Sequence, residues 1–478
     1  MSTLTHMQPR DYQKLGDRVF RVPRGEPWRI PLTLVKVPKF RSLSLTVLVW
    51  GFACIIGLGA FLLWLPISSK TGQFTPLSDV LFTATSATCV TGLVVVDTGT
   101  YWSTFGQGVI LALIQVGGFG FMTSATLLLL TLGQRVGLRE RFLMKESMGL
   151  QLGGLVPLIV GMGVFTIVLE SLGTAIYFIK FSGELPSGTA AWQALFLSVS
   201  AFNNAGFDIF GNNFRSLADY QGDPLITLTT AALVILGGIS FMVVMDVIRT
   251  RSFKKFSLDT KLVLTTVGSL LAVGMVVFLI TEYNNPDTLG PMSGPQKVLV
   301  AFFQSVTPRT AGFAVIGVGR LAVYTLFFTI MLMFVGGASG STAGGIKVNT
   351  FSVLLATVWS TLRGREHPGA FGREFKHQQI SRALTVALLS LGIVAVVVLI
   401  MTVTEEVEFI DALFETVSAF GTVGLTTGIT PLLSEAGKLI ITITMFAGRL
   451  GPLTLALSLV QAQQPSAYRF PQDQVRIG

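Results

Sequence analysis

Four short segments of this chain end in glycine and carry few reactive side chains. Aligned, they read LFTATSATCVTG, LFLSVSAFNNAG, AFFQSVTPRTAG and LFETVSAFGTVG, at residues 81–92, 195–206, 301–312 and 413–424. Each has Phe at its second position, and the final glycines are 114, 106 and 112 residues apart. Self-similarity at a nearly constant period indicates a repeated structural unit. The chemistry that such segments offer is that of the backbone carbonyl oxygen.

We predict that these segments form a cation filter. Rings of carbonyl oxygens can replace the hydration shell of an ion, and glycine permits backbone conformations that other residues avoid. The short helices before the glycines should point their negative C-terminal ends inward. A single glycine of this kind would be an ordinary turn glycine, but four in register favour a filter. The predicted cation site comprises Val90, Thr91, Gly92, Asn204, Ala205, Gly206, Thr310, Ala311, Gly312, Thr422, Val423 and Gly424. Backbone oxygens of Cys89, Asn203 and Arg309 are expected to contribute, with the Arg309 side chain turned behind the filter.

The third repeat has an unusually long apolar stretch. Residues 321–362 number 42, about twice what one membrane-spanning helix needs. Its middle, GGASGSTAGGIK at 336–347, has five glycines and three hydroxyl residues, which predicts a loop inside the membrane. We predict that this loop is a gate below the filter, with Gly336, Gly337, Ser339, Gly340, Ser341, Thr342, Gly344, Gly345 and Arg449 as its residues. A phosphate-binding loop is excluded because the order Gly-Lys-Ser/Thr is missing and no soluble strand precedes it.

Arg449 lies at the middle of an apolar stretch, where charged residues usually face a polar interior. It could anchor a loop carbonyl or pair with a carboxylate such as Glu415, and it could add a positive barrier beside the gate. Glu170 also lies within an apolar stretch, without an evident partner.

Glycines recur in the middle of the helix that follows each filter segment, where they either weaken the helix or allow close packing: Gly117, Gly118, Gly237, Gly238, Gly336, Gly337 and Gly448.

The elements that position these residues are membrane-spanning helices. The 478 residues are 51% hydrophobic and 12% charged, whereas soluble domains have about 25% charged residues. Eight long apolar stretches are expected to cross the membrane: 42–66, 104–134, 155–179, 224–248, 262–281, 321–362, 383–404 and 436–461. Two cysteines exclude a disulfide scaffold, and three histidines make a histidine metal site improbable.

Basic residues indicate the orientation. With eight spans, 25 of the 34 Lys and Arg fall on the side of the two termini and six on the other. The termini are therefore predicted to be cytoplasmic, in a multi-pass plasma (inner) membrane protein that contacts lipid. The net charge of +9 follows this topology, so a role in binding nucleic acid is not expected.

The predicted fold is an all-α polytopic membrane protein with four pseudo-symmetric helix–pore-loop–helix repeats around a central ion pore. The expected parts are a cytoplasmic arm (1–41), four repeats (42–134, 150–250, 259–362 and 381–461) and a cytoplasmic tail (462–478). A membrane enzyme is the alternative from another class. It should show paired carboxylates, an activated nucleophile or a metal cluster in the spans, and none is evident.

The motifs resemble the Trk/Ktr/HKT superfamily of potassium transporters over about residues 40–470. The resemblance rests on SATCVTGLVVVDTG, SAFNNAGFDIF, TPRTAGF, SAFGTVGLTTG, FMTSATLLLL, GGASGSTAGGIKVNTF and FAGRLGPLTLAL. Within this superfamily, the number of eight spans is most similar to that of the membrane subunit of the bacterial Ktr potassium uptake system. Pro308 and Gly421 depart from the small residues expected there.

The resemblance implies potassium uptake, often sodium-dependent, with K⁺ at the filter and Na⁺ as a coupling ion. Glycine at all four filter positions implies potassium, while a sodium-preferring transporter is the alternative within the superfamily. It also implies that 336–347 is the gate and that Arg449 is the characteristic arginine of the fourth repeat. A homodimer on a cytosolic ring of KtrA-like subunits that bind ATP or ADP is implied as well. The chain itself has no dinucleotide-binding motif, and no cofactor is expected in it.

Overall fold

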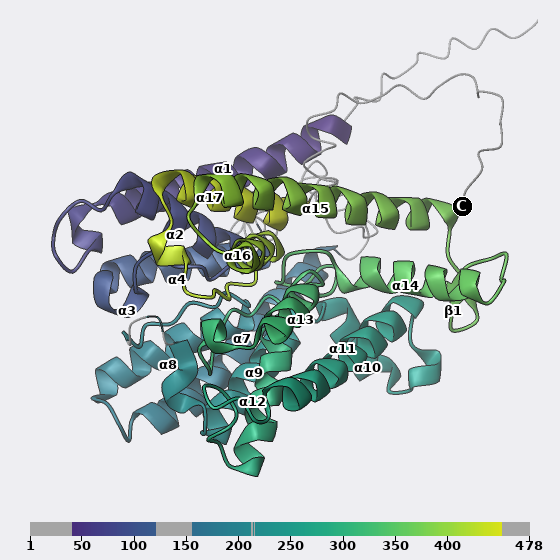
Figure 1. Cartoon of the computed structure of the whole chain (residues 1–478), viewed down its shortest axis with the longest axis horizontal. Helices are drawn as coiled ribbons and strands as arrows, with labels where there is room; N and C mark the ends of the chain where they lie inside the picture. Colours follow the sequence, from purple (N-terminus) through teal and green to yellow (C-terminus); the bar gives the residue numbers. More distant parts are fainter. Residues whose placement is uncertain (1–40, 121–154, 212–213, 215, 452–478) are drawn as a thin grey trace, which may run out of the picture. The chain divides into compact units, whose positions relative to one another are not determined.

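The computed structural model describes residues 41–120, 155–211, 214 and 216–451, and it is mostly helical there (Figure 1). In chain order the helices are α1 (Arg41–Trp64), α2 (Leu77–Cys89), α3 (Thr98–Tyr101), α4 (Thr104–Phe119), α7 (Leu155–Phe181), α8 (Ser187–Phe202), α9 (Pro224–Gly238), α10 (Phe241–Thr250), α11 (Leu258–Glu282), α12 (Gly294–Val306), α13 (Val323–Met333), α14 (Val348–Leu362), α15 (His377–Thr404), α16 (Phe409–Gly421) and α17 (Glu435–Leu450). Strands β1 (Gly369–Ala370) and β2 (Arg373–Glu374) form a short antiparallel hairpin. The predicted helical class is confirmed.

Twelve of these helices pack in four sets of three. A long outer helix contacts a short helix and a second helix in each set: α1 with α2 and α4, α7 with α8 and α9, α11 with α12 and α13, and α15 with α16 and α17. Figure 1 shows the last set, with α16 and α17 beside the long helix α15. An extended segment follows each short helix and leads toward the third member of the set.

Contacts between the sets close into a cycle. The third helix of each set packs on the short helix of the next one: α4 on α8, α9 on α12, α13 on α16, and α17 on α2. The last of these contacts joins the two ends of the described chain. The short helices α2, α8, α12 and α16 are therefore each held by two sets, and the extended segments that follow them meet at the centre.

Polar N-caps begin three of the four third helices, as expected from the side-chain oxygens that satisfy free backbone N–H groups. Ser103 Oγ accepts from Gly106 N at the start of α4, and Ser434 Oγ accepts from Gly437 N at the start of α17, both at 3.2 Å. Asp223 accepts from Leu225 N and Ile226 N at the start of α9. The helix starts thus follow from local sequence.

Among the described residues, three helices are long and apolar enough to cross a membrane: Pro157–Phe181, Leu258–Glu282 and His377–Thr404. The span predicted at 224–248 corresponds to α9 and α10, which pass together as apolar enough to cross but meet at a bend of 95°. The spans predicted at 104–134 and 436–461 extend beyond α4 and α17 into residues outside those described. The N-terminal arm, the basic residues at 135–145 and the C-terminal tail lie outside them too.

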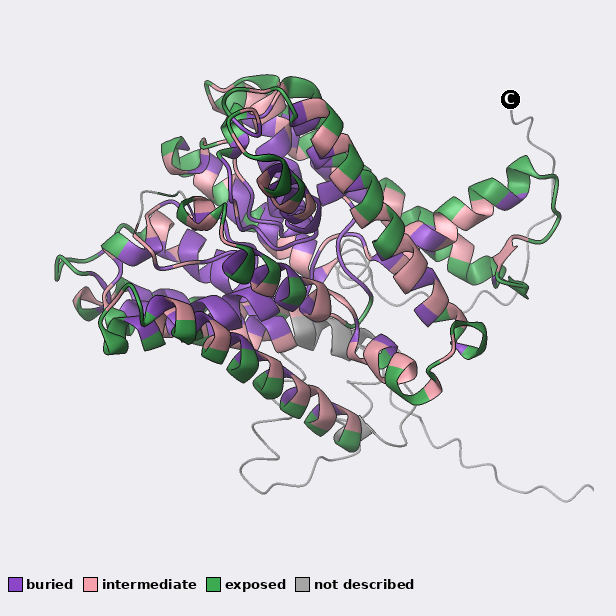
Figure 2. Cartoon of the chain, turned by 90° about the horizontal axis from the view of Figure 1, so that it is seen from below, coloured by how far each residue is buried: buried purple, intermediate pink, exposed green. Residues whose placement is uncertain are grey.

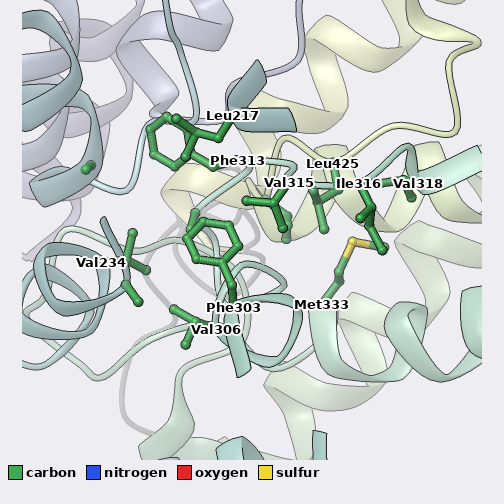
Figure 3. Packing of buried hydrophobic residues seen from close by; sticks show 14 of the residues in the cluster. Leu217, Val234, Phe303, Val306, Phe313, Val315, Ile316, Val318, Met333 and Leu425 are labelled. Carbon is green, nitrogen blue, oxygen red and sulfur yellow. The ribbon is translucent and has the colours of Figure 1, made fainter. Parts of the chain in front are cut away.

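Buried residues gather where the short helices and extended segments meet, while the outer helices expose apolar faces (Figure 2). Ile167 of α7 is 63% exposed and Leu399 of α15 is 66% exposed, as expected for helices that face lipid tails. The largest buried cluster surrounds the third segment. Figure 3 shows it formed by Phe303 and Val306 of α12, Val234 of α9, Met333 of α13, and Phe313 in the extended chain. Such close side-chain packing stabilises helix contacts in a membrane, where burial from water contributes little between helices.

Candidate functional site

The four glycine segments, residues 90–92, 204–206, 310–312 and 422–424, share one backbone conformation. Their first residues are left-handed, with φ of 57° at Val90, 57° at Asn204, 63° at Thr310 and 50° at Thr422. Their glycines also have positive φ, from 70° at Gly206 to 94° at Gly92. A left-handed conformation is costly for β-branched residues such as valine and threonine, so it persists only where the surrounding structure holds it.

The glycines of the four segments meet in a closed ring. A Cβ atom added at any one of them would lie within 3.0 Å of a carbonyl oxygen in the next segment. The contacts run from Gly92 to Ala205 O, from Gly206 to Ala311 O, from Gly312 to Val423 O, and from Gly424 to Thr91 O. No side chain fits at these positions without moving backbone. The arrangement brings together all twelve residues of the predicted cation site.

Hydroxyl groups of the short helices hold the segments in place. Ser86 Oγ accepts from Gly92 N at 3.1 Å and donates to Leu93 O at 2.7 Å. Ser418 Oγ accepts from Gly424 N at 3.1 Å, and Thr307 Oγ1 donates to Phe313 O at 2.6 Å. These bonds fasten the glycine end of the first, third and fourth segments to the short helix before it.

A cavity of about 930 Å³ opens on one side of the ring. All four glycines line it, together with the extended chain that follows each segment. Asp208, Asp287 and Arg320 are its charged lining residues. Water and hydrated ions can therefore reach the ring from this side.

Asp208 lies two residues beyond Gly206, partly buried beside this cavity. Burial raises the pKa of Asp208 to about 6, although hydrogen bonds from Phe210 N and the Ser216 side chain lower it. The negative charge of Asp97 adds to the rise in the pKa. The Asp208 carboxyl therefore changes charge near neutral pH at the mouth of the ring.

The glycine-rich loop, residues 336–347, lies on the other side of the ring. Its ends pair at Gly336 N and Ile346 O, 2.9 Å apart, between the end of α13 and the start of α14. A Cβ atom added at Gly336 would lie 3.3 Å from Thr310 Cγ2, and one added at Gly345 would lie 3.1 Å from Gly421 O. The loop thus touches the inner ends of the third and fourth glycine segments.

Backbone carbonyls at the bend between α9 and α10 hold the same loop. Ala338 N donates to Gly238 O at 3.0 Å, and Thr342 Oγ1 donates to Gly237 O at 3.0 Å. The bend frees these carbonyls from the helix, because the chain turns before a further turn of α9 can use them. The α9–α10 bend that sequence reasoning missed is therefore one of the supports of the loop.

Arg449, in the last turn of α17, fastens the loop from a third direction. Its guanidinium donates to Thr342 O at 2.5 Å and to Gly117 O of α4. The structure therefore shows the first alternative predicted from the sequence, in which Arg449 anchors a carbonyl of the loop. Pairing with Glu415 is not observed in the described part of the chain, where Arg449 donates to the carbonyls of Thr342 and Gly117, and Glu415 accepts from Thr430 Oγ1.

The mid-helix glycines allow close packing. A Cβ atom added at Gly117, Gly237 or Gly448 would collide with a backbone carbonyl at the end of a short helix, namely Thr88 O, Phe202 O or Phe420 O. Each contact lies within one set of three helices. Close packing therefore explains why glycine occurs at these positions, without the alternative that it weakens the helix.

The three residues that directly precede the first, second and third glycine segments have buried side chains. Cys89 is fully buried, and Arg309 is 6% exposed with no hydrogen-bond partner for its guanidinium among the described residues. The Asn203 amide is held by Gln115 and Glu170. Glu170 therefore has two hydrogen-bond partners, Asn203 and Gln115, that its position in the sequence did not reveal. The sequence did offer one hint, because Gln115 is a second polar residue inside an apolar helix.

Apolar outer helices around a ring of four glycines define a polytopic membrane transport protein. The chain belongs to the TrkH family of cation transport proteins, whose sequence profile matches residues 46–469. The predicted membrane fold class and the superfamily resemblance are thereby confirmed.

Several characterised relatives cover nearly the whole chain. Ktr system potassium uptake protein B of Bacillus subtilis (strain 168) is 46% identical over 435 residues, which are 90% of this chain and 96% of that protein. The protein of the same name from Vibrio alginolyticus is 39% identical, over 96% of this chain and 98% of its own length. Potassium/sodium uptake protein NtpJ of Enterococcus hirae is 36% identical, over 94% of this chain and 100% of its own. These relatives are ion transporters and not enzymes, so the alternative of a membrane enzyme is rejected.

A solved structure shares the fold. The crystal structure of the potassium transporter TrkH from Vibrio parahaemolyticus superposes with a TM-score of 0.69 at 18% sequence identity, covering 89% of this chain and 86% of that one. The arrangement of helices is thus retained at low sequence identity.

Proposed function

We propose that this chain takes up potassium across the plasma membrane, through a filter made of the four glycine segments. The observation that carries the proposal is the closed ring in which each glycine faces a carbonyl oxygen of the next segment. Carbonyl oxygens that face one another can replace the hydration shell of K⁺. The names of two relatives, both potassium uptake proteins, support the choice of ion.

The four sets of three helices act, in this proposal, as four repeats around the ion path. Their bounds are 42–134, 150–250, 259–362 and 381–461. The cyclic contacts from α4 on α8 through to α17 on α2 support this arrangement. The common left-handed conformation at Val90, Asn204, Thr310 and Thr422 supports it independently.

The glycine-rich loop acts as the gate. Its contacts with Thr310 and Gly421 support this role because they place it beside the inner ends of two glycine segments. Its fastening by Arg449 and by the carbonyls of Gly237 and Gly238 supports a closed state. Opening requires these few hydrogen bonds to break, and glycines can absorb the backbone change.

Regulation comes from other subunits. We propose a homodimer that binds a cytosolic ring of nucleotide-binding subunits, with both termini and the basic loops in the cytoplasm. The relatives' names describe members of a system, which supports further components. The excess of Lys and Arg on one side supports this orientation.

Sodium enters the proposal as a coupling ion. The relative named potassium/sodium uptake protein favours a second possibility, a transporter that prefers sodium. The two differ in which ion the filter binds more tightly, while the architecture is the same.

Uptake by cells that lack their own potassium transporters tests the proposal. Cells that express this chain with its cognate regulatory subunit should grow and accumulate potassium at micromolar to millimolar concentrations, faster with sodium present. Cells that carry the chain in the membrane and accumulate sodium, but no potassium, would support the second possibility. Accumulation of neither ion would contradict both.

A further inference from the structure

A carboxylate in the middle of α7 lies behind the second glycine segment. Glu170 is 8% exposed, and its Oε1 accepts from Asn203 Nδ2 at 2.9 Å. Its Oε2 accepts from Gln115 Nε2 of α4 at 3.4 Å. Carboxylates inside a membrane helix are rare and commonly functional, so this one needs a reason beyond helix packing.

The third set of helices provides an internal comparison. In the second set, Ser198 Oγ of α8 donates to Glu170 O at 2.7 Å, with Gly173 packed against Ser198. In the third set, Ser305 Oγ of α12 donates to Leu271 O at 2.7 Å, with Gly274 packed against Ser305. Glu170 and Leu271 therefore occupy the same place in the same helix contact. Because leucine suffices in one set, the carboxylate in the other is not required to join the two helices.

The Glu170 carboxylate instead restrains the Asn203 side chain by a hydrogen bond. The amide nitrogen of Asn203 has three acceptors: Glu170 Oε1 and Val199 O, both at 2.9 Å, and Gln115 Oε1 at 3.1 Å. Its amide oxygen lies against Gly118 of α4, where an added Cβ atom would overlap it. The side chain is thus fixed between α4, α7 and α8.

Asn203 directly precedes the second glycine segment. The next residue, Asn204, is left-handed with φ of 57°, and the oxygen of Ala205 is the one that faces Gly92. A rotation of the backbone at Asn203 moves those carbonyl oxygens. Glu170 accepts from both Asn203 and Gln115, and Gln115 in turn accepts from Asn203, so the three side chains together restrain this rotation.

We infer that Glu170 is a positioning residue of the ring: it fixes the second glycine segment through Asn203 and thereby favours potassium over sodium. The inference rests on the proposed function for the choice of ions, and on the geometry alone for the positioning. A smaller ion needs the carbonyl oxygens to move inward, so a segment that is held rigidly disfavours sodium, whereas a loosened one accepts it.

Substitutions at Glu170 can be accommodated. One side of the carboxylate borders an open hollow of about 460 Å³ lined by apolar side chains that include Ile167, Phe178 and Leu195. Glu170→Leu reproduces the residue of the third set. Glu170→Gln keeps an acceptor for Asn203 and removes the charge. Ser198→Ala is the matched control, because it removes the bond between α7 and α8 but leaves the Asn203 network intact.

The first measurement is hydrogen exchange of the backbone amides of residues 199–206 in the full chain, purified with its regulatory subunit. Glu170→Leu should speed exchange in this peptide about tenfold, as expected when a buried donor loses its acceptor, and Glu170→Gln less. Ser198→Ala should change it less than about twofold. This readout tests the positioning even if the chain carries no potassium. Unchanged exchange in a folded Glu170→Leu protein overturns the inference.

The second measurement is rubidium and sodium flux in proteoliposomes. Glu170→Leu should lower the rubidium-to-sodium ratio about tenfold, and Asn203→Leu should add little when combined with it, because both remove the same bond. A ratio equal to that of the wild type overturns the role in selectivity. A wild-type chain that conducts neither ion contradicts the proposed function instead and leaves the exchange result as the test of positioning.

Discussion

The guanidinium of Arg449 donates to the carbonyl oxygen of Thr342 at 2.5 Å, and so ties the last turn of α17 to the glycine-rich loop. Because the same side chain also donates to Gly117 O of α4, one residue joins the first and fourth sets of helices to a loop of the third. Charge-assisted bonds of this kind are stronger than neutral ones, so they hold the loop firmly against α4 and α17.

Arg449→Ala should raise potassium flux. The substitution removes two hydrogen bonds from a charged donor, each worth about 1.5–3 kcal/mol, and it removes a positive charge beside the ion path. Flux through proteoliposomes should rise about tenfold or more. Arg449→Lys keeps the charge with a single-point donor and should raise flux less. Equal fluxes in Arg449→Ala and the wild type would contradict a closing role for this residue.

Deletion of the loop centre, Ser339 to Ala343, should have a related effect. The flanking helices α13 and α14 remain, and the loop loses Thr342, the residue that contacts both Arg449 and Gly237. Flux should rise and should depend less on the regulatory subunit. Arg449→Ala should add little to the deletion, because its main partner is gone. If the deletion protein is inserted and stable but conducts no faster, the loop is packing between helices and no gate.

Gly312→Ser should weaken the preference for potassium over sodium. Gly312 has φ of 74°, and an added Cβ atom would meet Val423 O at 2.5 Å, so the third and fourth segments must separate. Gly317→Ser is the control. It lines the same cavity, but its Cβ would meet only the flexible side chain of Arg320. Competition of sodium with rubidium uptake measures the change, and the idea fails if both variants keep the wild-type ratio.

Gly448→Ala should destabilise the folded chain. The added methyl group would overlap Phe420 O at the end of α16, and overpacking of this kind costs about 1–3 kcal/mol. The apparent melting temperature in detergent should fall. Gly57→Ala and Gly268→Ala, which have open space at the Cβ position, should leave it unchanged or raise it. Equal melting temperatures for all three variants would show that close packing at Gly448 is not needed.

Uptake should depend on pH through Asp208. Its pKa is raised to about 6, so the carboxyl is mostly charged at pH 7.5 and mostly neutral at pH 5. A negative charge at the cavity attracts cations, so uptake at low potassium should fall as pH decreases through 6. Asp208→Asn should transport slowly at both pH values, with this step absent. Asp287→Asn removes another carboxylate of the same cavity and should retain the step. If uptake by Asp208→Asn still falls as pH decreases through 6, the pH dependence comes from another group.

The sequence predicted those parts of the site that depend on the conformation of a short stretch of backbone. The glycines of the four segments and the interruption at 336–347 can be read from the chain, because glycine and its spacing directly report backbone conformation. The bend between α9 and α10 could not be read this way. Residues 224–248 are mostly apolar, and hydropathy does not distinguish a straight helix from one that turns by 95°.

Partners that lie far apart in sequence were harder to predict. Arg449 binds carbonyl oxygens, which every residue has, so nothing in the sequence identifies Thr342 and Gly117 as its acceptors. Gln115, Glu170 and Asn203 come from three helices that meet only because α4 packs on α8 and α7 packs on α8. Their polarity inside apolar stretches was visible, but their contact depends on the cyclic arrangement of the four sets.

Anomalous diffraction from crystals grown in thallium, a heavy substitute for potassium, tests the central claim most directly. The account predicts a thallium peak at the centre of the ring, coordinated by carbonyl oxygens of residues 90–91, 204–205, 310–311 and 422–423. The peak should disappear on exchange into potassium and persist in sodium of the same concentration. A well-ordered ring without a peak, or a peak displaced equally by sodium and potassium, would contradict a potassium filter at the four glycines.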